Sequence, residues 1–154
     1  MHLLDETARS EWIDYNGHLY DGYYAVIFAR ATDEFLLRIG LTPAVREATR
    51  HTIYTMETHV RFLWEVKLGT PLAVTCQLIE LDAKRVRLFL SMRDKLRDIV
   101  VATSEQLLMS IDQTGEAHSA PWLPESLRIL EGLRAEHAAL PMPKDAGRSI
   151  AIKR

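Results

Sequence analysis

The densest cluster of polar and aromatic side chains in the sequence lies between residues 12 and 24. Its chemically active members are Asp14, Asn16, His18 and Asp21. A carboxylate can attack a carbonyl carbon or remove a proton from water, and a histidine can act as a general acid or base. By residue type alone, Asp14 fits either a catalytic group or a solvated carboxylate that shapes a turn.

Aromatic residues accompany these groups, and they could serve packing or ligand binding. The candidates are Trp12, Tyr15, Tyr20, Tyr23 and, from a later segment, Trp64. Aromatic side chains at the edge of a fold usually pack, but aromatic faces also hold quaternary ammonium groups. Both interpretations stay open: a packing cluster, or a pocket for a cationic group.

The segment that follows must position these side chains, and its pattern predicts a helix over residues 22–39. Apolar side chains recur at helical spacing from Tyr24 to Ile39, and they are numerous enough to predict a largely buried helix. Asp21 stands at the expected N-cap and Gly40 at the expected end. The first N–H groups of a helix lack partners within it and carry the positive end of its dipole, so they can stabilise a developing negative charge.

Farther along the chain the apolar pattern alternates with a period of two, which is typical of strands. Turn residues separate the alternating runs, so we expect an antiparallel meander. A buried helix needs a sheet around it, which predicts an α+β fold: an antiparallel sheet wrapped around one long central helix, plus a short C-terminal helix. We expect strands over 3–10, 58–65, 72–79, 85–92 and 99–111, a connector over 41–51 and a second helix over 125–139.

Length and composition restrict the class of protein. The 154 residues suit one domain, which we place at residues 1–140, with a tail at 141–154 that could order against a partner subunit. The net charge of −2 argues against nucleic-acid binding. The single cysteine, the acidic N-terminus and the lack of a long apolar run predict a cytoplasmic protein without an intrachain disulfide, signal peptide or membrane span. The sequence shows no metal-ligand spacing or nucleotide-binding motif, so we expect no metal and no cofactor.

A family resemblance rests first on Asp14, Gly17, His18 and Tyr24. Hotdog-fold acyl-CoA thioesterases of the 4-hydroxybenzoyl-CoA thioesterase type have an Asp, a Gly-His pair and an aromatic residue at these places. The chain resembles this family over most of its length. It is most similar to the branch of betainyl-CoA thioesterases of carnitine catabolism, through segments that include Glu57–Phe62, Lys84–Arg85, Ala102–Gln106 and Ala120–Pro121.

The resemblance implies the hotdog fold and hydrolysis of an acyl-CoA thioester, with betainyl-CoA as the expected substrate and no cofactor besides the CoA of the substrate. Asp14 would attack the thioester carbonyl or deprotonate the attacking water, and the backbone N–H of Asp21 would hold the carbonyl oxygen. His18 and Asn16 would take part in catalysis or brace the loop. The resemblance also implies a homodimer or homotetramer with an active site shared between subunits.

Some assignments stay open. Glu57 and Glu105 are rival carboxylates, although we expect Glu105 to be a paired structural residue. Tyr20 replaces an Asn of the betainyl-CoA branch, so the acyl group could also be aromatic or short and aliphatic. The chain could instead be a hotdog dehydratase or a non-catalytic acyl-CoA-binding protein. Basic strand residues are usually only solvated, but three of them could meet the phosphates of CoA: Arg61, Lys84 and Arg85.

Overall fold

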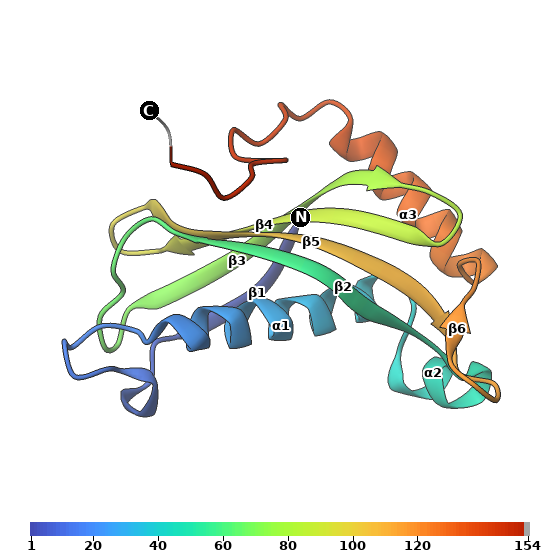
Figure 1. The fold of residues 1–154 in the computed structure, drawn as a ribbon, viewed down its shortest axis with the longest axis horizontal. Helices are drawn as coiled ribbons and strands as arrows, with labels where there is room; N and C mark the ends of the chain where they lie inside the picture. Colours follow the sequence, from blue (N-terminus) through green and yellow to red (C-terminus); the bar gives the residue numbers. More distant parts are fainter. Residues whose placement is uncertain (153–154) are drawn as a thin grey trace.

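A curled antiparallel sheet arches over one long helix in the computed structural model, which describes residues 1–152 (Figure 1). The α+β architecture predicted from the sequence is therefore confirmed. The strands are β1 (His2–Thr7), β2 (His51–Phe62), β3 (Pro71–Leu81), β4 (Arg85–Asp94), β5 (Ile99–Asp112) and β6 (His118–Ser119). The helices are α1 (Asp21–Arg38), α2 (Pro43–Thr49) and α3 (Pro124–His137), with a 3-10 turn, η1, at Ser10–Trp12.

The strand order is β1-β3-β4-β5-β2, with β6 paired to β5. The meander prediction is right for β3, β4 and β5, but wrong for β2, which pairs with β5 instead of β3. The segment 63–70 carries the chain from β2 at one edge of the sheet across to β3 near the other edge. Strand β1 pairs with β3 and forms that other edge. Alternation of apolar residues indicates which face of a strand is buried, but it does not identify the neighbouring strand.

Helix α1 buries one face against the sheet. Its buried residues are Tyr24, Ile27, Phe28, Ala31, Thr32, Phe35 and Leu36. The opposite face, which includes Val26, Ala29 and Asp33, is exposed in a single chain. The expectation of a largely buried helix was therefore too strong, because the sheet covers only one side of it.

Helix α2 was missed by the sequence analysis, which expected a connector. The Thr42 hydroxyl caps it by accepting the Val45 N–H (3.3 Å), Pro43 occupies its first turn, and Arg50 ends it with a left-handed backbone (φ 58°). Threonine followed by proline is a known helix start, so a local signal was present. None of the residues of α2 is buried, which explains why it lacks an apolar pattern.

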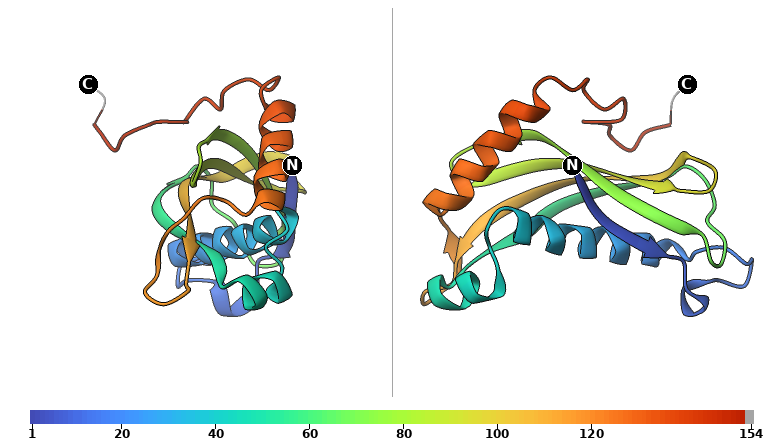
Figure 2. Two further views of the ribbon diagram at one scale, coloured as in Figure 1. Left: turned by 90° about the vertical axis from the view of Figure 1, so that its right-hand side faces the viewer. Right: turned by 180° about the vertical axis from the view of Figure 1, so that it is seen from behind.

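Helix α3 and the tail lie on the outer face of the sheet, opposite α1 (Figure 2). His137 joins α3 to β3, since its Nδ1 accepts the Leu78 N–H (2.9 Å). The tail, as far as residue 152, contacts the sheet of its own chain through the Gly147 N–H, which donates to Glu105 (2.8 Å). The domain division at residue 140 stays a prediction, and residues 153 and 154 of the expected tail lie outside the described residues.

A chain of hydroxyl and amide groups, most of them buried, links α1 to the sheet. The Thr32 hydroxyl lies 2.8 Å from Gln106 Oε1 and 3.0 Å from the carbonyl oxygen of Phe28. The Gln106 amide nitrogen donates to the Ser104 hydroxyl (3.3 Å), which lies 3.2 Å from the Thr58 hydroxyl on β2. Because Thr32, Ser104 and Gln106 are buried, their side chains depend on one another for hydrogen bonds.

Replacing Thr32 by Val removes the hydroxyl and nearly keeps the side-chain shape. We expect the free energy of unfolding to fall by about 1–3 kcal/mol, because the buried Gln106 amide loses a partner. Urea unfolding measures this change. Thr75→Val is the matched control, because Thr75 is exposed on β3, and its effect should stay within about 0.5 kcal/mol. Equal unfolding free energies for Thr32→Val and the wild type would contradict a stabilising role for these groups.

Candidate active site

The loop between β1 and α1 forms a tight turn at Asp14. The Asp14 N–H donates to the His18 carbonyl (2.8 Å), and the Gly17 N–H donates to the Asp14 carbonyl (3.0 Å). Gly17 has φ 78°, a left-handed conformation that costs little without a Cβ atom. The Leu19 N–H donates to the Val66 carbonyl (2.7 Å) and ties the turn to the segment before β3. Main-chain bonds therefore hold the turn in place.

The same turn orients the carboxylate of Asp14. Its Oδ1 accepts the backbone N–H groups of Asn16 (2.8 Å) and His18 (3.1 Å). No residue from 1 to 152 donates a hydrogen bond to Oδ2, and the side chain is half-buried. The turn therefore fixes the direction of the carboxylate and leaves one oxygen free for chemistry.

The first three residues of α1 each have a backbone N–H group, and two of these groups donate hydrogen bonds within the chain. The Gly22 N–H donates to the Asp21 carboxylate (2.8 Å), and the Tyr23 N–H donates to the Tyr20 carbonyl (2.9 Å). The N–H of Asp21 itself has no acceptor in the described part of the chain. This N–H stands at the positive end of the helix dipole and is available to a ligand.

Asp21 is not the N-cap that the sequence pattern predicted. Tyr20 takes that position with an extended backbone (φ −60°, ψ 140°), and Asp21 is the first residue of the helix. The Tyr20 N–H donates to the Trp12 carbonyl (2.9 Å), which holds Tyr20 in the loop so that the helix begins directly after it. The Asp21 carboxylate thus lies in the first turn, where a negative charge is favourable.

The turn and the start of α1 line one cleft of about 520 Å³. The end of β2 and the residues after it form the opposite wall. The lining residues are Asp14, Tyr15, His18, Leu19, Tyr20, Asp21, Tyr24, Phe62, Leu63, Trp64 and Glu65. Among the described residues, the lining combines aromatic rings with carboxylates and contains no lysine or arginine. This composition favours a ligand group that is partly apolar and positively charged.

Tyr24 connects α1 to the opposite wall of the cleft. Its hydroxyl donates to the Trp64 carbonyl (3.3 Å), and its ring meets Phe62 edge-on with centroids 5.2 Å apart. Burial raises the pKa of the Tyr24 phenol, and the Glu65 carboxylate raises it further, so the phenol stays protonated at neutral pH. Sequence reasoning missed Phe62 and Glu65. The alternation along β2 could have indicated Phe62, whereas no sequence signal places Glu65 beside the loop.

The sequence matches the family model of the thioesterase-like superfamily over residues 8–148. The chain belongs to the thioesterase-like superfamily. This thioesterase is 39% identical over 142 residues to a betainyl-CoA thioesterase from Pseudomonas aeruginosa, with 92% of this chain and 89% of that protein covered. It is also 37% identical over 155 residues to an L-carnitine dehydrogenase/betainyl-CoA thioesterase from Rhizobium meliloti. That match covers 100% of this chain and 31% of the Rhizobium protein.

Two solved structures have the same fold as this thioesterase. A hypothetical protein from Staphylococcus aureus in complex with CoA has a TM-score of 0.92 and 28% identity, with 99% of this chain and 96% of that chain covered. A putative thioesterase from Pseudomonas putida KT2440 has a TM-score of 0.85 and 33% identity, with coverages of 100% and 97%. The prediction of a hotdog-fold thioester hydrolase is therefore confirmed, in place of a dehydratase or a non-catalytic binding protein.

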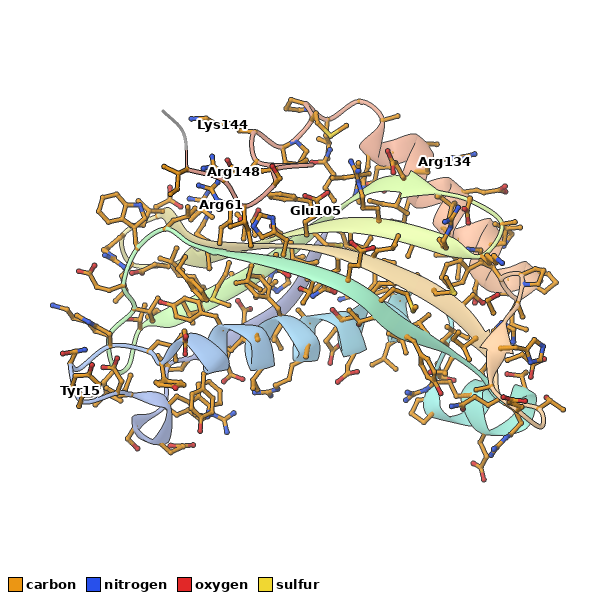
Figure 3. The ribbon with its side chains drawn as sticks, viewed as in Figure 1. Tyr15, Arg61, Glu105, Arg134, Lys144 and Arg148 are labelled. Carbon is orange, nitrogen blue, oxygen red and sulfur yellow. The ribbon has the colours of Figure 1, made fainter. Side chains whose placement is uncertain are left out.

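The structure brings some of the predicted aromatic residues to the cleft of this thioesterase. Tyr15, Tyr20 and Trp64 line it, and Figure 3 shows Tyr15 at the loop that precedes α1. Trp12 and Tyr23 instead stack on each other, with ring centroids 5.5 Å apart, and Trp12 is buried. These two rings do not line the cleft, and their contact supports the loop by packing.

His18 and Asn16 brace the turn through their backbone N–H groups, which donate to Asp14. The His18 ring lines the cleft and makes no hydrogen bond within residues 1–152, and the Asn16 side chain is exposed. These contacts support bracing. A part in the chemical step stays a prediction for both residues.

The predicted CoA-binding residues Arg61, Lys84 and Arg85 do not line this cleft. Arg61 pairs with Asp145 of the tail, on the outer face of the sheet (Figure 3). Lys84 and Arg85 lie at the turn between β3 and β4 and bond to nearby side chains. Their roles in binding CoA stay predictions.

A larger groove of about 760 Å³ on the outer face contains both rival carboxylates. Glu105 pairs with Arg87 (3.4 Å) and accepts the Gly147 N–H, which is the structural role expected for it. Glu57 is exposed on β2. Neither residue lines the cleft that contains Asp14.

The cysteine thiol, possible metal ligands and possible membrane spans can be described one by one for residues 1–152. Burial raises the pKa of the Cys76 thiol to about 11, so the thiol stays protonated and unreactive at neutral pH. Residues 1–152 contain no group of three His, Cys, Asp or Glu side chains placed to hold a metal ion. No helix in this range is long and apolar enough to cross a membrane. The cytoplasmic location stays a prediction.

Proposed function

We propose that this thioesterase hydrolyses betainyl-CoA to betaine and CoA, with Asp14 as the reactive carboxylate and the Asp21 N–H as the oxyanion donor. The proposal rests on a free carboxylate oxygen and a free helix N–H that lie at one cleft. Thioester hydrolysis needs a nucleophile or base to form the new bond, and a donor to stabilise charge on the carbonyl oxygen. The choice of betaine as the acyl group is supported by the names of the relatives and by the aromatic and acidic residues that line the cleft.

In the proposed reaction, Asp14 acts in one of two ways. Its carboxylate attacks the thioester carbon, or it removes a proton from a water molecule that attacks instead. In both routes the carbonyl oxygen becomes an oxyanion that accepts a hydrogen bond from the Asp21 N–H. The C–S bond then breaks, CoA leaves as a thiolate, and His18, which lines the same cleft, can pass a proton to it. In the route in which Asp14 attacks, a mixed anhydride of Asp14 and betaine remains, and water hydrolyses it to betaine and the free carboxylate.

A panel of CoA esters tests the proposed substrate. Free thiol released from betainyl-CoA, 4-hydroxybenzoyl-CoA and acetyl-CoA is followed with a thiol reagent. We expect the highest kcat/KM for betainyl-CoA. A clear preference for either of the other esters would contradict the proposed acyl group. The absence of thiol release from every ester would contradict the catalytic role of the cleft.

The active form, we infer, is at least a homodimer joined along β2. This strand is 12 residues long and lies at one end of the sheet order. Its exposed side chains include Tyr54 and Met56. A long exposed edge strand presents unpaired backbone groups, and proteins usually cover such edges. The strand at the other end, β1, has only 6 residues.

Sedimentation should therefore give a mass of two or four times the 17.6 kDa of one chain. Met56→Lys should shift the equilibrium towards the monomer, because it places a charge in the β2 contact. Leu96→Lys is the matched control, because Leu96 is an exposed apolar residue in the turn between β4 and β5. A wild-type mass of one chain would contradict the dimer.

A further inference from the structure

Three carboxylates line the cleft, and they differ in the groups that already bind them. Asp14 Oδ1 accepts two backbone N–H groups, and Asp21 Oδ1 accepts the Gly22 N–H. The Glu65 carboxylate has no hydrogen bond or ion pair with any other residue from 1 to 152. Its backbone carbonyl accepts a hydrogen bond from Arg97 Nη2 (2.7 Å), which fixes the main chain at this residue.

The proposed reaction determines which of these charges persists. Asp14 loses its negative charge when it attacks the carbonyl carbon or takes a proton from water. The Asp21 carboxylate is held by the first turn of its own helix. Glu65 forms no bond and takes no proton in either route. In a betainyl group one methylene separates the quaternary nitrogen from the carbonyl carbon, so the counter-ion of that nitrogen must lie in the same cleft.

The surroundings of Glu65 suit a quaternary ammonium group. Such a group has no N–H, so it is held by charge and by aromatic faces. Trp64 and Tyr20 line the same cleft and are exposed to 57% and 54%. The Arg97 guanidinium does not line the cleft, and its Nε donates to the carboxylate of Asp94 (2.5 Å), which offsets its positive charge.

We propose that Glu65 is the counter-ion for a positively charged acyl group, and that Glu65 and Trp64 together make this thioesterase prefer cationic over neutral acyl-CoA substrates. The inference rests on the proposed function and adds the residues that select the acyl group. Glu65 supplies the charge, and Trp64 supplies the apolar face that the methyl groups contact.

The test compares betainyl-CoA with 3,3-dimethylbutanoyl-CoA, which has the same shape and no charge. The measured quantity is the ratio of the two kcat/KM values. Glu65→Gln should lower this ratio by roughly tenfold, through a higher KM for betainyl-CoA, because one unit charge near the cation is lost in a partly hydrated cleft. The rate with the neutral ester should not change. Added salt should lower the ratio for the wild type more than for Glu65→Gln.

Three further variants separate binding from structure. Glu11→Gln removes one negative charge from an exposed residue of the preceding loop that does not line the cleft, so it should leave the ratio unchanged. Trp64→Leu should lower the ratio, whereas Trp64→Phe should retain most of it, because phenylalanine keeps an aromatic face.

The outcomes distinguish this inference from the proposed function. Betainyl-CoA turnover with an unchanged ratio in Glu65→Gln would overturn the counter-ion and leave the proposed substrate in place. An equal loss with both esters would show that Glu65 acts only on the structure of the cleft. Hydrolysis of the neutral ester without hydrolysis of betainyl-CoA, in the wild type, would overturn the proposed substrate itself.

Discussion

Asp14→Asn should lower kcat for betainyl-CoA by about a thousandfold, because the variant loses the negative charge that attacks the carbonyl or activates water. Its fold should survive. The Asn side-chain oxygen can accept the same N–H groups, from Asn16 and His18, that Asp14 Oδ1 accepts now. Steady-state thiol release measures kcat, and thermal unfolding measures stability.

Asp33→Asn is the matched control for this variant. Asp33 is exposed on α1 and does not line the cleft, so its substitution removes one charge and should leave kcat unchanged. If Asp14→Asn turned over as fast as the wild type, Asp14 would not be the reactive carboxylate. If its kcat fell together with a large drop in Tm, the loss would reflect a damaged turn.

Asp21→Pro should lower kcat by about 10²–10³-fold, because proline has no N–H with which to stabilise the oxyanion. The position tolerates proline structurally. Asp21 is the first residue of α1, where proline is common, and the extended backbone of Tyr20 suits a residue that precedes proline. The Asp21 N–H also has no acceptor among residues 1–152, so the substitution breaks no hydrogen bond of that group.

Asp21→Ala separates the N–H from the side chain. It removes the carboxylate, as proline does, but keeps the backbone donor, so it should retain most of the wild-type kcat. Equal and large losses of kcat in the proline and alanine variants would assign the effect to the carboxylate. A kcat close to that of the wild type in both variants would show that another group holds the carbonyl oxygen.

Most elements of the fold could be predicted from the sequence because their apolar side chains recur on one face. Apolar spacing indicated α1 and the long strands, since burial of one face imposes a period on the side chains. The place of β2 beside β5 could not be read in this way, because alternation carries no information on the neighbouring strand. Helix α2 was not predicted for a related reason. None of its residues is buried, so its sequence has no periodic apolar pattern, and only Thr42 and Pro43 indicate its start.

The candidate site could be predicted only as far as one continuous segment reaches. Asp14 and Tyr20 are close in the sequence, so their grouping was visible before folding. Glu65 comes from beyond the far end of β2, and only the tertiary structure brings it to the same cleft. Trp12 illustrates the opposite case, because it belongs to the same segment of the sequence but packs on Tyr23 and does not line the cleft.

The central claim is spatial: the free oxygen of Asp14 faces the carbon, and the free N–H of Asp21 binds the oxygen, of the same thioester carbonyl. A crystal structure with a betainyl-CoA ketone analogue, in which a methylene replaces sulfur so that no hydrolysis occurs, tests it most directly. We predict that the carbonyl oxygen lies about 3 Å from the Asp21 nitrogen, with the carbonyl carbon facing Asp14 Oδ2. A carbonyl group bound elsewhere, with water alone on the Asp21 N–H, would contradict the account.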